Sequence, residues 1–319
     1  MKKILKKYWF IFGLIIVFIL TIADLTGTLS GAGKWLKSHR GPDIAIILIF
    51  FISGLMLNAE QVKQGLMDLK GFFVALVLIF IAAPIVAMVL GMAPLHTGVK
   101  VGLFLVAVMP STLSSGVVMA GAAGGNIAHA LFITITSNIL AVFTIPISLG
   151  LMLSFAGDFS AVVIDSYAMM TKIALFVVLP LMMGLGINYF LKNILKRFNF
   201  YLPIANQCLI LCMVWMGLSQ SRHVIVNNTD TILIIFLLVF IFHGIMLLLA
   251  FLFTKQAGIL PGKRESVIFM GGQKTLPLSV IIQVSIFPQY ALALVVCVTH
   301  HIVHLLMDGY LAGRLSRKG

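Results

Sequence analysis

Ten apolar blocks run along this chain, and most are long enough to cross a lipid bilayer as a helix. A transmembrane helix needs about 20 mostly apolar residues, and inside lipid only helices and closed barrels satisfy the backbone. The second block is short, and polar residues interrupt the fourth and ninth. The blocks are residues 8–25, 43–58, 71–92, 99–121, 127–154, 167–191, 203–222, 230–254, 266–284 and 290–313. The sequence therefore predicts an all-α polytopic membrane protein with ten transmembrane helices.

The positions of the positive charges predict how the chain is oriented. The chain is 61% hydrophobic and 10% charged, with a net charge of +13, whereas a soluble domain is about a quarter charged. If the N-terminus lies inside, 15 of the 22 lysines and arginines fall in inside segments and 5 in outside segments. Lysine and arginine accumulate in cytoplasmic loops. We therefore expect an integral protein of the bacterial inner (plasma) membrane with both termini cytoplasmic, embedded in lipid and without a nucleic-acid partner.

Two short matches suggest that the chain is duplicated. Thr112–Val118 resembles Thr275–Ile281, and Gly54–Leu55 resembles Gly217–Leu218, both at an offset of 163 residues. Five spans is an odd number, so the second copy must enter the membrane from the opposite side, as in transporters built from inverted repeats. The expected repeats are residues 1–158 and 159–319, with the functional site between the interrupted fourth and ninth spans.

Lys274 is a charged residue inside the ninth block, beside helix-breaking neighbours. Gly271 and Gly272 precede it, Pro277 follows it and Gln273 is adjacent. A charge at membrane depth costs at least about 2.5–3.5 kcal/mol, so it indicates a functional site. Lys274 could replace a sodium ion, pair with an anionic substrate or release a proton, and a structural salt bridge is the plainer alternative. Gln273 could bind an ion or contact a substrate.

Hydroxyl groups gather at the interruption of the fourth block. Pro110 removes a backbone hydrogen bond there, and the freed backbone groups must find partners. The hydroxyls could serve that purpose, or they could bind a hard cation, which prefers oxygen ligands. The fourth-block residues are Ser111, Thr112, Ser114 and Ser115, and the fifth block adds Thr134, Ser137 and Asn138.

Three histidines lie in the tenth block, at His300, His301 and His304. The first and last are four residues apart, on one helix face, but no carboxylate or thiolate clearly completes a metal site. A proton-responsive or hydrogen-bonding role is favoured, and Asp308 could pair with His304. His243 is interpreted as a packing residue.

Four motifs resemble the bile acid:sodium symporter superfamily, and within it the SBF-like branch of sodium-dependent transporters. They are Phe51–Leu55, Met109–Thr112, Gly125–Asn126 and Gly272–Leu278. The resemblance implies a panel domain of spans 1, 2, 6 and 7 and a core domain of spans 3–5 and 8–10, in which spans 4 and 9 cross. It also implies two sodium ions behind the crossing and an organic anion in front of it, between core and panel.

The resemblance implies sodium ligands at Ser115, Thr134 and Gln273. Other ligand positions of the family hold residues that cannot replace the family's side chains: they are Gly116, Ala130 and Phe269. Phe269 stands where the family has a glutamate shared by both sodium sites, and Lys274 stands where it has an asparagine. Sodium loses its carboxylate and meets a positive charge next to it. We therefore expect the Lys274 ammonium to take the place of at least one sodium ion.

The predicted function is secondary active transport of a small organic anion by alternating access. No cofactor is expected apart from sodium, and no ATP-binding or enzymatic motif is found. The predicted substrate contacts are Ser111, Thr112, Ser114, Lys274 and Thr275. The predicted ion-binding residues are Ser115, Thr134, Ser137, Gln273 and Lys274.

Two alternatives remain at this point, and the substrate, coupling ion and oligomeric state stay open. A cation/proton antiporter would need a buried carboxylate near the crossing, and Asp24 and Asp308 both lie near block ends. A non-transporting membrane regulator would not need the many polar groups at the two interruptions. Lys172 lies close enough to a block end to extend toward the membrane surface.

Overall fold

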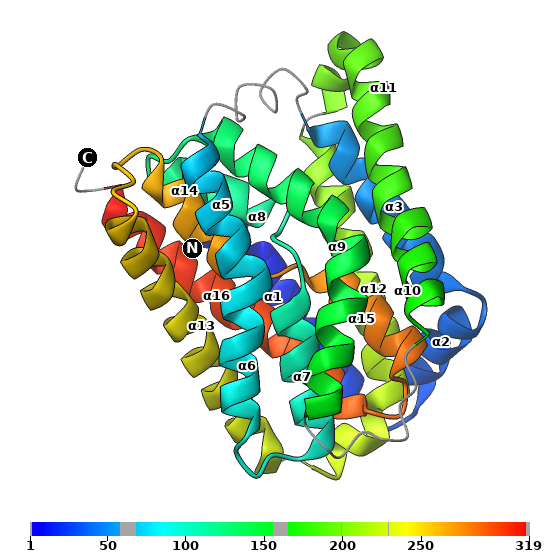
Figure 1. The fold of residues 1–319 in the computed structure, drawn as a ribbon. Helices are drawn as coiled ribbons and strands as arrows, with labels where there is room; N and C mark the ends of the chain where they lie inside the picture. Colours follow the sequence, from blue (N-terminus) through cyan, green and yellow to red (C-terminus); the bar gives the residue numbers. More distant parts are fainter. Residues whose placement is uncertain (1, 58–67, 156–164, 199, 229, 317–319) are drawn as a thin grey trace.

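The computed structural model describes residues 2–57, 68–155, 165–198, 200–228 and 230–316, and these residues form helices joined by short connections, with no strand among them (Figure 1). The first half contains α1 (Lys2–Ile22), α2 (Thr28–Ser38), α3 (Gly41–Met56), α5 (Leu69–Val77), η1 (Leu78–Ala82), α6 (Ala83–Gly91), α7 (Thr97–Val108), α8 (Ser115–Ala122) and α9 (Ile127–Phe155). The second half contains α10 (Ser166–Ile173), η2 (Ala174–Val178), α11 (Leu179–Leu195), η3 (Lys196–Phe198), α12 (Tyr201–Val226), α13 (Asp230–Gln256), α14 (Arg264–Gly272), α15 (Leu276–Ile286) and α16 (Ala291–Leu315).

Among the described residues, seven helical segments are long and apolar enough to cross a membrane. An eighth is added if α2 and α3, which meet at a bend of 75°, count as one span. Residues 9–22 of α1 and the whole of α7 form shorter apolar helices. All ten predicted blocks are largely helical, and α2 is an additional helix that the hydropathy pattern did not predict. Ten membrane crossings therefore stay a prediction.

Local backbone geometry and capping shape the helix ends. Arg40, between α2 and α3, has a left-handed φ of 61°, and Pro42 lies in the first turn of α3, where a missing N–H costs nothing. The carboxylate of Asp68 caps α5 by accepting from the backbone N–H of Gly71 at 3.2 Å. The third block is continued by the π-helical turn η1, a feature that is often found at functional sites.

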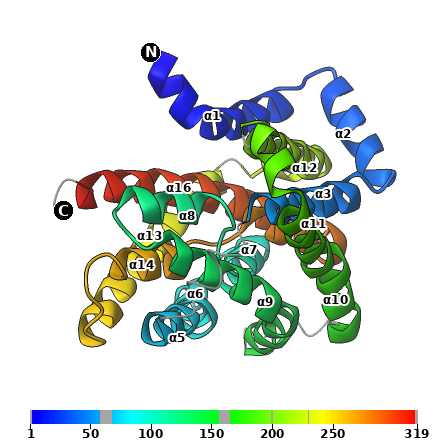
Figure 2. The same ribbon diagram turned by 90° about the horizontal axis from the view of Figure 1, so that it is seen from above.

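The helices pack as two groups, which Figure 2 shows from above. The first helix group contains α1, α2, α3, α11 and α12, and α10 is joined to it through η2. The second helix group contains α5–α9 and α13–α16. The two groups also touch, because α15 and α16 contact α12 and α9 contacts α10. The expected panel comprised spans 1, 2, 6 and 7, and the expected core spans 3–5 and 8–10. The division into those domains stays a prediction, and the expected repeat boundary at 158/159 lies outside the described residues.

The segment from α14 to α15 lies at the centre of the molecule. Every residue in the 18-residue apolar stretch of this segment is buried, although the segment is the least hydrophobic of the seven candidate spans. In α16, the next helix, 78% of the residues in the corresponding 18-residue stretch are buried. Polar groups on these two helices therefore have protein rather than lipid around them.

Candidate functional site

The two interrupted blocks are broken helices, and their breaks touch. The fourth block is non-helical from Met109 to Ser114, and the ninth is non-helical from Gln273 to Thr275. The main-chain N–H of Thr275 in one break donates to the carbonyl of Pro110 in the other at 3.0 Å. Both helix breaks were predicted from proline and glycine, and the hydrogen bond brings the two polar stretches into one place.

Lys274 lies in the second break with its ammonium group directed into the protein. The side chain is only 1% exposed. Its Nζ donates to the carbonyls of Ile79 at 2.8 Å, Ala107 at 2.8 Å and Met109 at 3.0 Å. An ammonium has three donors, so all of them are used. Lys274 is therefore held by protein carbonyls.

These carbonyls are available because the helices that carry them are irregular. Ala107 and Met109 lie at the C-terminal end of α7, where carbonyls lack partners within the helix and the dipole is negative. Ile79 lies in the π-helical turn η1. Oxygen atoms from two segments thus form a seat suited to a small cation, and the ammonium of Lys274 occupies it.

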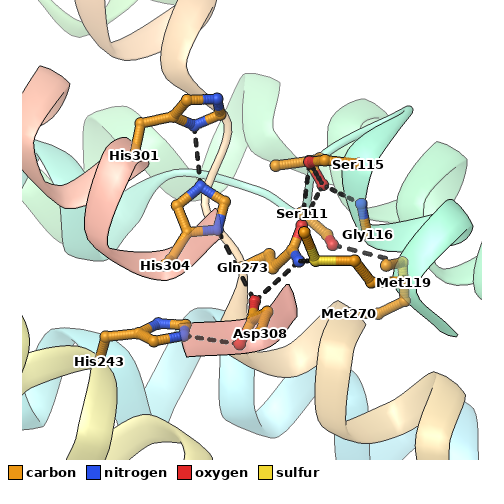
Figure 3. A network of polar contacts seen from close by, with 11 residues as sticks. Ser111, Ser115, Gly116, Met119, His243, Met270, Gln273, His301, His304 and Asp308 are labelled. Carbon is orange, nitrogen blue, oxygen red and sulfur yellow. Dashed lines mark hydrogen bonds and ion pairs between the residues drawn. The ribbon is translucent and has the colours of Figure 1, made fainter. Parts of the chain in front are cut away.

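A second cluster of oxygen atoms forms around the side chain of Gln273. Its Oε1 accepts from Thr112 Oγ1 at 2.7 Å and from Ser115 Oγ at 3.1 Å. Ser115 Oγ also lies 3.1 Å from Thr112 Oγ1, which accepts from the backbone N–H of Gly116 at 2.9 Å. The predicted ion-binding residues Ser115 and Gln273 are therefore brought together (Figure 3), and Thr112 contacts both of them.

The predicted residues of α9 contact the backbone of the first break. Thr134 Oγ1 donates to the carbonyls of Ser111 at 3.2 Å and Thr112 at 2.9 Å. Asn138 Nδ2 donates to the same Ser111 carbonyl at 3.1 Å, and Ser137 Oγ accepts from the Ser111 N–H at 3.4 Å. These side chains satisfy backbone groups that the broken helix leaves free. Thr134 and Ser137 thus lie at the break, where their hydroxyls contact its backbone.

The remaining predicted residues lie around the same breaks. Ser114, directly before α8, is half-buried. Ser111 is fully buried, and its hydroxyl points to the sulfur of Met270 at 3.5 Å. Thr275 is 6% exposed.

Asp308 is a buried carboxylate at this site, and the sequence interpretation missed it. Its side chain is 0% exposed. Oδ2 accepts from Gln273 Nε2 at 2.7 Å, and Oδ1 lies 2.8 Å from His243 Nε2 (Figure 3). Because Asp308 lies near the end of its block, no buried carboxylate was expected near the breaks. That expectation was wrong, because α16 packs against the second break and buries the carboxylate there.

The histidines extend the network away from the breaks. His304 Nδ1 lies 3.7 Å from Asp308 Oδ2, and His304 Nε2 shares a 2.8 Å hydrogen bond with His301 Nδ1. The expected pairing of His304 with Asp308 is therefore present, but His243 makes the shorter contact, so its interpretation as a packing residue was incomplete. Within the described ranges, no group of three or more histidine, cysteine, aspartate or glutamate side chains could hold a metal ion. The network joins Gln273 to buried groups on α13 and α16.

Comparisons with known proteins agree with the family resemblance of the motifs. A family model described as the SBF-like CPA transporter family (DUF4137) matches residues 8–317. Sodium/bile acid cotransporter 7 of Xenopus tropicalis is 31% identical over 295 residues, which cover 90% of this chain and 84% of that protein. The protein of that name in Danio rerio is 28% identical over 294 residues, 89% of this chain and 85% of that protein.

A plant protein is also similar. It is named probable sodium/metabolite cotransporter BASS4, chloroplastic, and comes from Arabidopsis thaliana. It is 28% identical over 300 residues, which cover 85% of this chain and 65% of that protein.

Proposed function

Since this chain belongs to the SBF-like CPA transporter family, we propose that it is a secondary active transporter that carries a small organic anion by alternating access. The family consists of transporters of the integral membrane type, and the apolar helices agree with it. The proposal also includes ten spans in two inverted repeats and both termini in the cytoplasm of a bacterium. The two touching helix breaks and the distribution of lysine and arginine support these points.

The carbonyl seat of Lys274 is the observation that carries the proposal. In a transporter coupled to sodium, oxygen atoms of broken helices bind the ion at this depth. Here three carbonyls hold an ammonium instead. We infer that Lys274 is a fixed internal cation that replaces one sodium ion. Because its donors are all used, a direct role in binding the substrate is disfavoured.

One candidate binding site remains for a coupling cation, beside Gln273. The side-chain oxygens of Thr112, Ser115 and Gln273 are separated by 2.7–3.1 Å. The carboxylate of Asp308 accepts a hydrogen bond from the amide nitrogen of the same glutamine. Asp308 can supply the negative charge that Phe269 lacks, and carboxylate and hydroxyl oxygens suit a hard cation. The names of the relatives, sodium/bile acid and sodium/metabolite cotransporters, support sodium as that ion. Thr134 and Ser137 would then hold the backbone of the first break in place.

The substrate would be an anion bound near the helix breaks. The N-terminal ends of α8 and α15 carry positive dipoles that favour negative groups. Ser111, Thr112, Ser114 and Thr275 lie at those ends or directly before them. We propose them as the polar surroundings of the substrate.

Cation/proton exchange is the second candidate function. It was disfavoured because no buried carboxylate was expected near the breaks, and Asp308 removes that objection. Proteoliposomes loaded with a pH-sensitive dye distinguish the two candidates. Exchange would change the internal pH when sodium is added without any organic anion, whereas cotransport would need the anion.

The main test is a thermal-shift measurement on the purified full-length protein, with carboxylates and sulfonates added while sodium and pH are varied independently. We expect an anion to stabilise the protein more when sodium is present, and that anion to accumulate in vesicles along a sodium gradient. Absence of any cation-dependent accumulation of the stabilising anions would falsify the proposed function.

A further inference from the structure

His243 on α13 holds one oxygen of the Asp308 carboxylate in place. Its Nε2 lies 2.8 Å from Oδ1 of Asp308, and both side chains are 0% exposed. An ionised carboxylate only accepts hydrogen bonds, so the imidazole donates through Nε2. A rotation of the carboxyl group would leave this oxygen buried without its donor, which is costly. The contact therefore fixes the orientation of the carboxylate.

The other carboxylate oxygen fixes the side-chain amide of Gln273. Oδ2 of Asp308 accepts from Gln273 Nε2 at 2.7 Å, and the sulfur of Met119 accepts from the same nitrogen at 3.1 Å (Figure 3). Both N–H groups of the amide therefore have an acceptor. If the amide turned over, its oxygen would face the carboxylate, and two acceptors would lie opposite each other without a proton between them. Asp308 thus selects one orientation of the amide.

That orientation directs the amide oxygen of Gln273 toward the first break. Oε1 accepts from Thr112 Oγ1 at 2.7 Å and from Ser115 Oγ at 3.1 Å. These three oxygens are the candidate ligands of the coupling cation. With the amide reversed, its N–H groups would replace the oxygen at this position, and an N–H group has no lone pair to offer a cation. A cation-binding oxygen is therefore present here because Asp308 holds the amide.

The contacts run from α13 through α16 to the second break, entirely inside the protein. Gln273 is 0% exposed, like His243 and Asp308, so bulk water does not reach them to replace a missing donor. His304 is also near the carboxylate, but its Nδ1 lies 3.7 Å from Oδ2, which is too far for a hydrogen bond. The orientation of the carboxylate therefore depends on His243.

We propose that His243 is a positioning residue of the coupling-cation site, and that it acts through Asp308 on the amide of Gln273. This inference rests on the proposed function, which places the coupling cation beside that glutamine. The imidazole does not touch the cation in this arrangement. Removing an outer partner of a metal ligand typically weakens metal binding 10–100-fold, so the role of His243 is measurable as sodium affinity.

The test measures the sodium concentration that produces half of the maximal rise in melting temperature of the purified full-length protein. Choline chloride keeps the ionic strength constant. His243→Phe keeps a ring but removes the donor, and it should raise the half-maximal sodium concentration roughly tenfold or more. His243→Gln removes the ring but keeps an N–H donor, so it should retain most of the sodium affinity.

Phe242→Leu is the matched control, because Phe242 precedes His243 on α13, is 0% exposed and has no hydrogen-bonding side chain. It should lower the melting temperature without sodium but leave the half-maximal sodium concentration unchanged. If His243→Phe behaves in the same way, His243 only packs and the inference is overturned. Equal losses of sodium affinity in His243→Phe and His243→Gln also overturn it, because the donor would then not matter. If His243→Phe does not fold, His243→Asn, with its shorter side chain, replaces it.

Transport separates this inference from the proposed function. If vesicles with His243→Phe accumulate an anion with the same dependence on sodium as the unchanged protein, the function stands and the role of His243 fails. If sodium binding needs the His243 donor but the unchanged protein accumulates no anion along a sodium gradient, the positioning role stands and the proposed function fails. Absence of any sodium-dependent shift in the unchanged protein overturns the inference together with the sodium site.

Discussion

The side-chain amide of Gln273 donates a 2.7 Å hydrogen bond to the carboxylate of Asp308, which links the second helix break to the last helix. The same glutamine accepts hydrogen bonds from Thr112 and Ser115 of the first break through its oxygen. One side chain thus connects both breaks to a buried negative charge. Any ion or conformational change that affects the breaks will also affect α13 and α16 through Asp308 and His243.

Replacing Asp308 by asparagine should remove the response to the coupling cation. Asp308→Asn keeps the shape of the side chain but leaves no carboxylate beside Gln273, so sodium should no longer raise the melting temperature. The lost charge-assisted contacts to Gln273 and His243 should also cost about 1–3 kcal/mol of stability. Asp230→Asn, at an exposed position on α13, is the control. A sodium response equal to that of the unchanged protein would exclude Asp308 from the cation site.

Replacing Lys274 by asparagine should create a second cation-binding site. The carbonyls of Ile79, Ala107 and Met109 would lose the ammonium and become available to a free ion. The dependence of the melting temperature on sodium concentration should then become steeper, as expected when one more ion binds the folded state. Choline chloride at equal ionic strength is the control, and an unchanged slope would contradict the replacement of sodium by lysine.

Lys274→Met should distinguish the effect of losing the ammonium from the effect of opening the three-carbonyl site to an ion. Methionine leaves three buried carbonyls without their donor, and each unsatisfied group costs about 1–3 kcal/mol, partly offset by removing a buried charge. We expect a lower melting temperature and no transport, at any sodium concentration. If sodium restores the melting temperature of Lys274→Asn but not that of Lys274→Met, the three-carbonyl site binds an ion only when the side chain at position 274 leaves space for it.

The helix breaks could be predicted from the sequence, whereas the partners of the polar side chains could not. Pro110, Pro277 and the neighbouring glycines determine local backbone geometry, so both breaks followed from the order of residues. The three carbonyls around Lys274 come from residues 165–195 positions away, and hydropathy carries no information on such distant contacts.

The burial of Asp308 is a second feature that hydropathy along the chain could not predict. Distance from the end of an apolar block estimates membrane depth, but not whether another helix covers a side chain. His243, alone in the eighth block, carried no signal until α13 and α16 were seen to pack together. α2 was also missed, because its mixture of glycine, lysine and apolar residues does not form a continuous apolar block.

Asp24 should make the junction between α1 and α2 sensitive to acid. Its carboxylate accepts from the backbone N–H and the hydroxyl of Ser30, both at 2.8 Å, and from Thr26 at 3.0 Å. The backbone hydrogen bond of Ser30 is the main cause that lowers the pKa of Asp24 from 3.8 to about 2. A carboxyl with a lowered pKa stabilises the fold above its ordinary pKa, and this contribution is lost as the pH falls toward the lowered value.

The corresponding experiment compares Asp24→Asn with the unchanged protein. The difference between their melting temperatures should be constant between neutral pH and about pH 4, and should shrink as the pH falls toward 2. Asp230→Asn, at an exposed position on α13, is measured alongside as the control. A difference that does not depend on pH would mean that the carboxylate charge is not what holds Ser30.

The close crossing of α3 and α11 should be the packing contact least tolerant of added volume. A Cβ on Gly54 would lie 2.2 Å from the backbone oxygen of Leu181, and a Cβ on Gly184 would lie 2.2 Å from that of Phe51. Small residues let helices approach this closely in membranes. Gly54→Ala should therefore separate the helices and lower stability by about 1–3 kcal/mol.

Gly150→Ala is the matched control, because a Cβ at Gly150 in α9 would meet nothing within 4 Å. Alanine at this position should be neutral or should stabilise the protein by about 0.5–1 kcal/mol. Equal melting temperatures for the two variants would mean that α3 and α11 can separate without cost, and that the first helix group is not the rigid body that alternating access requires.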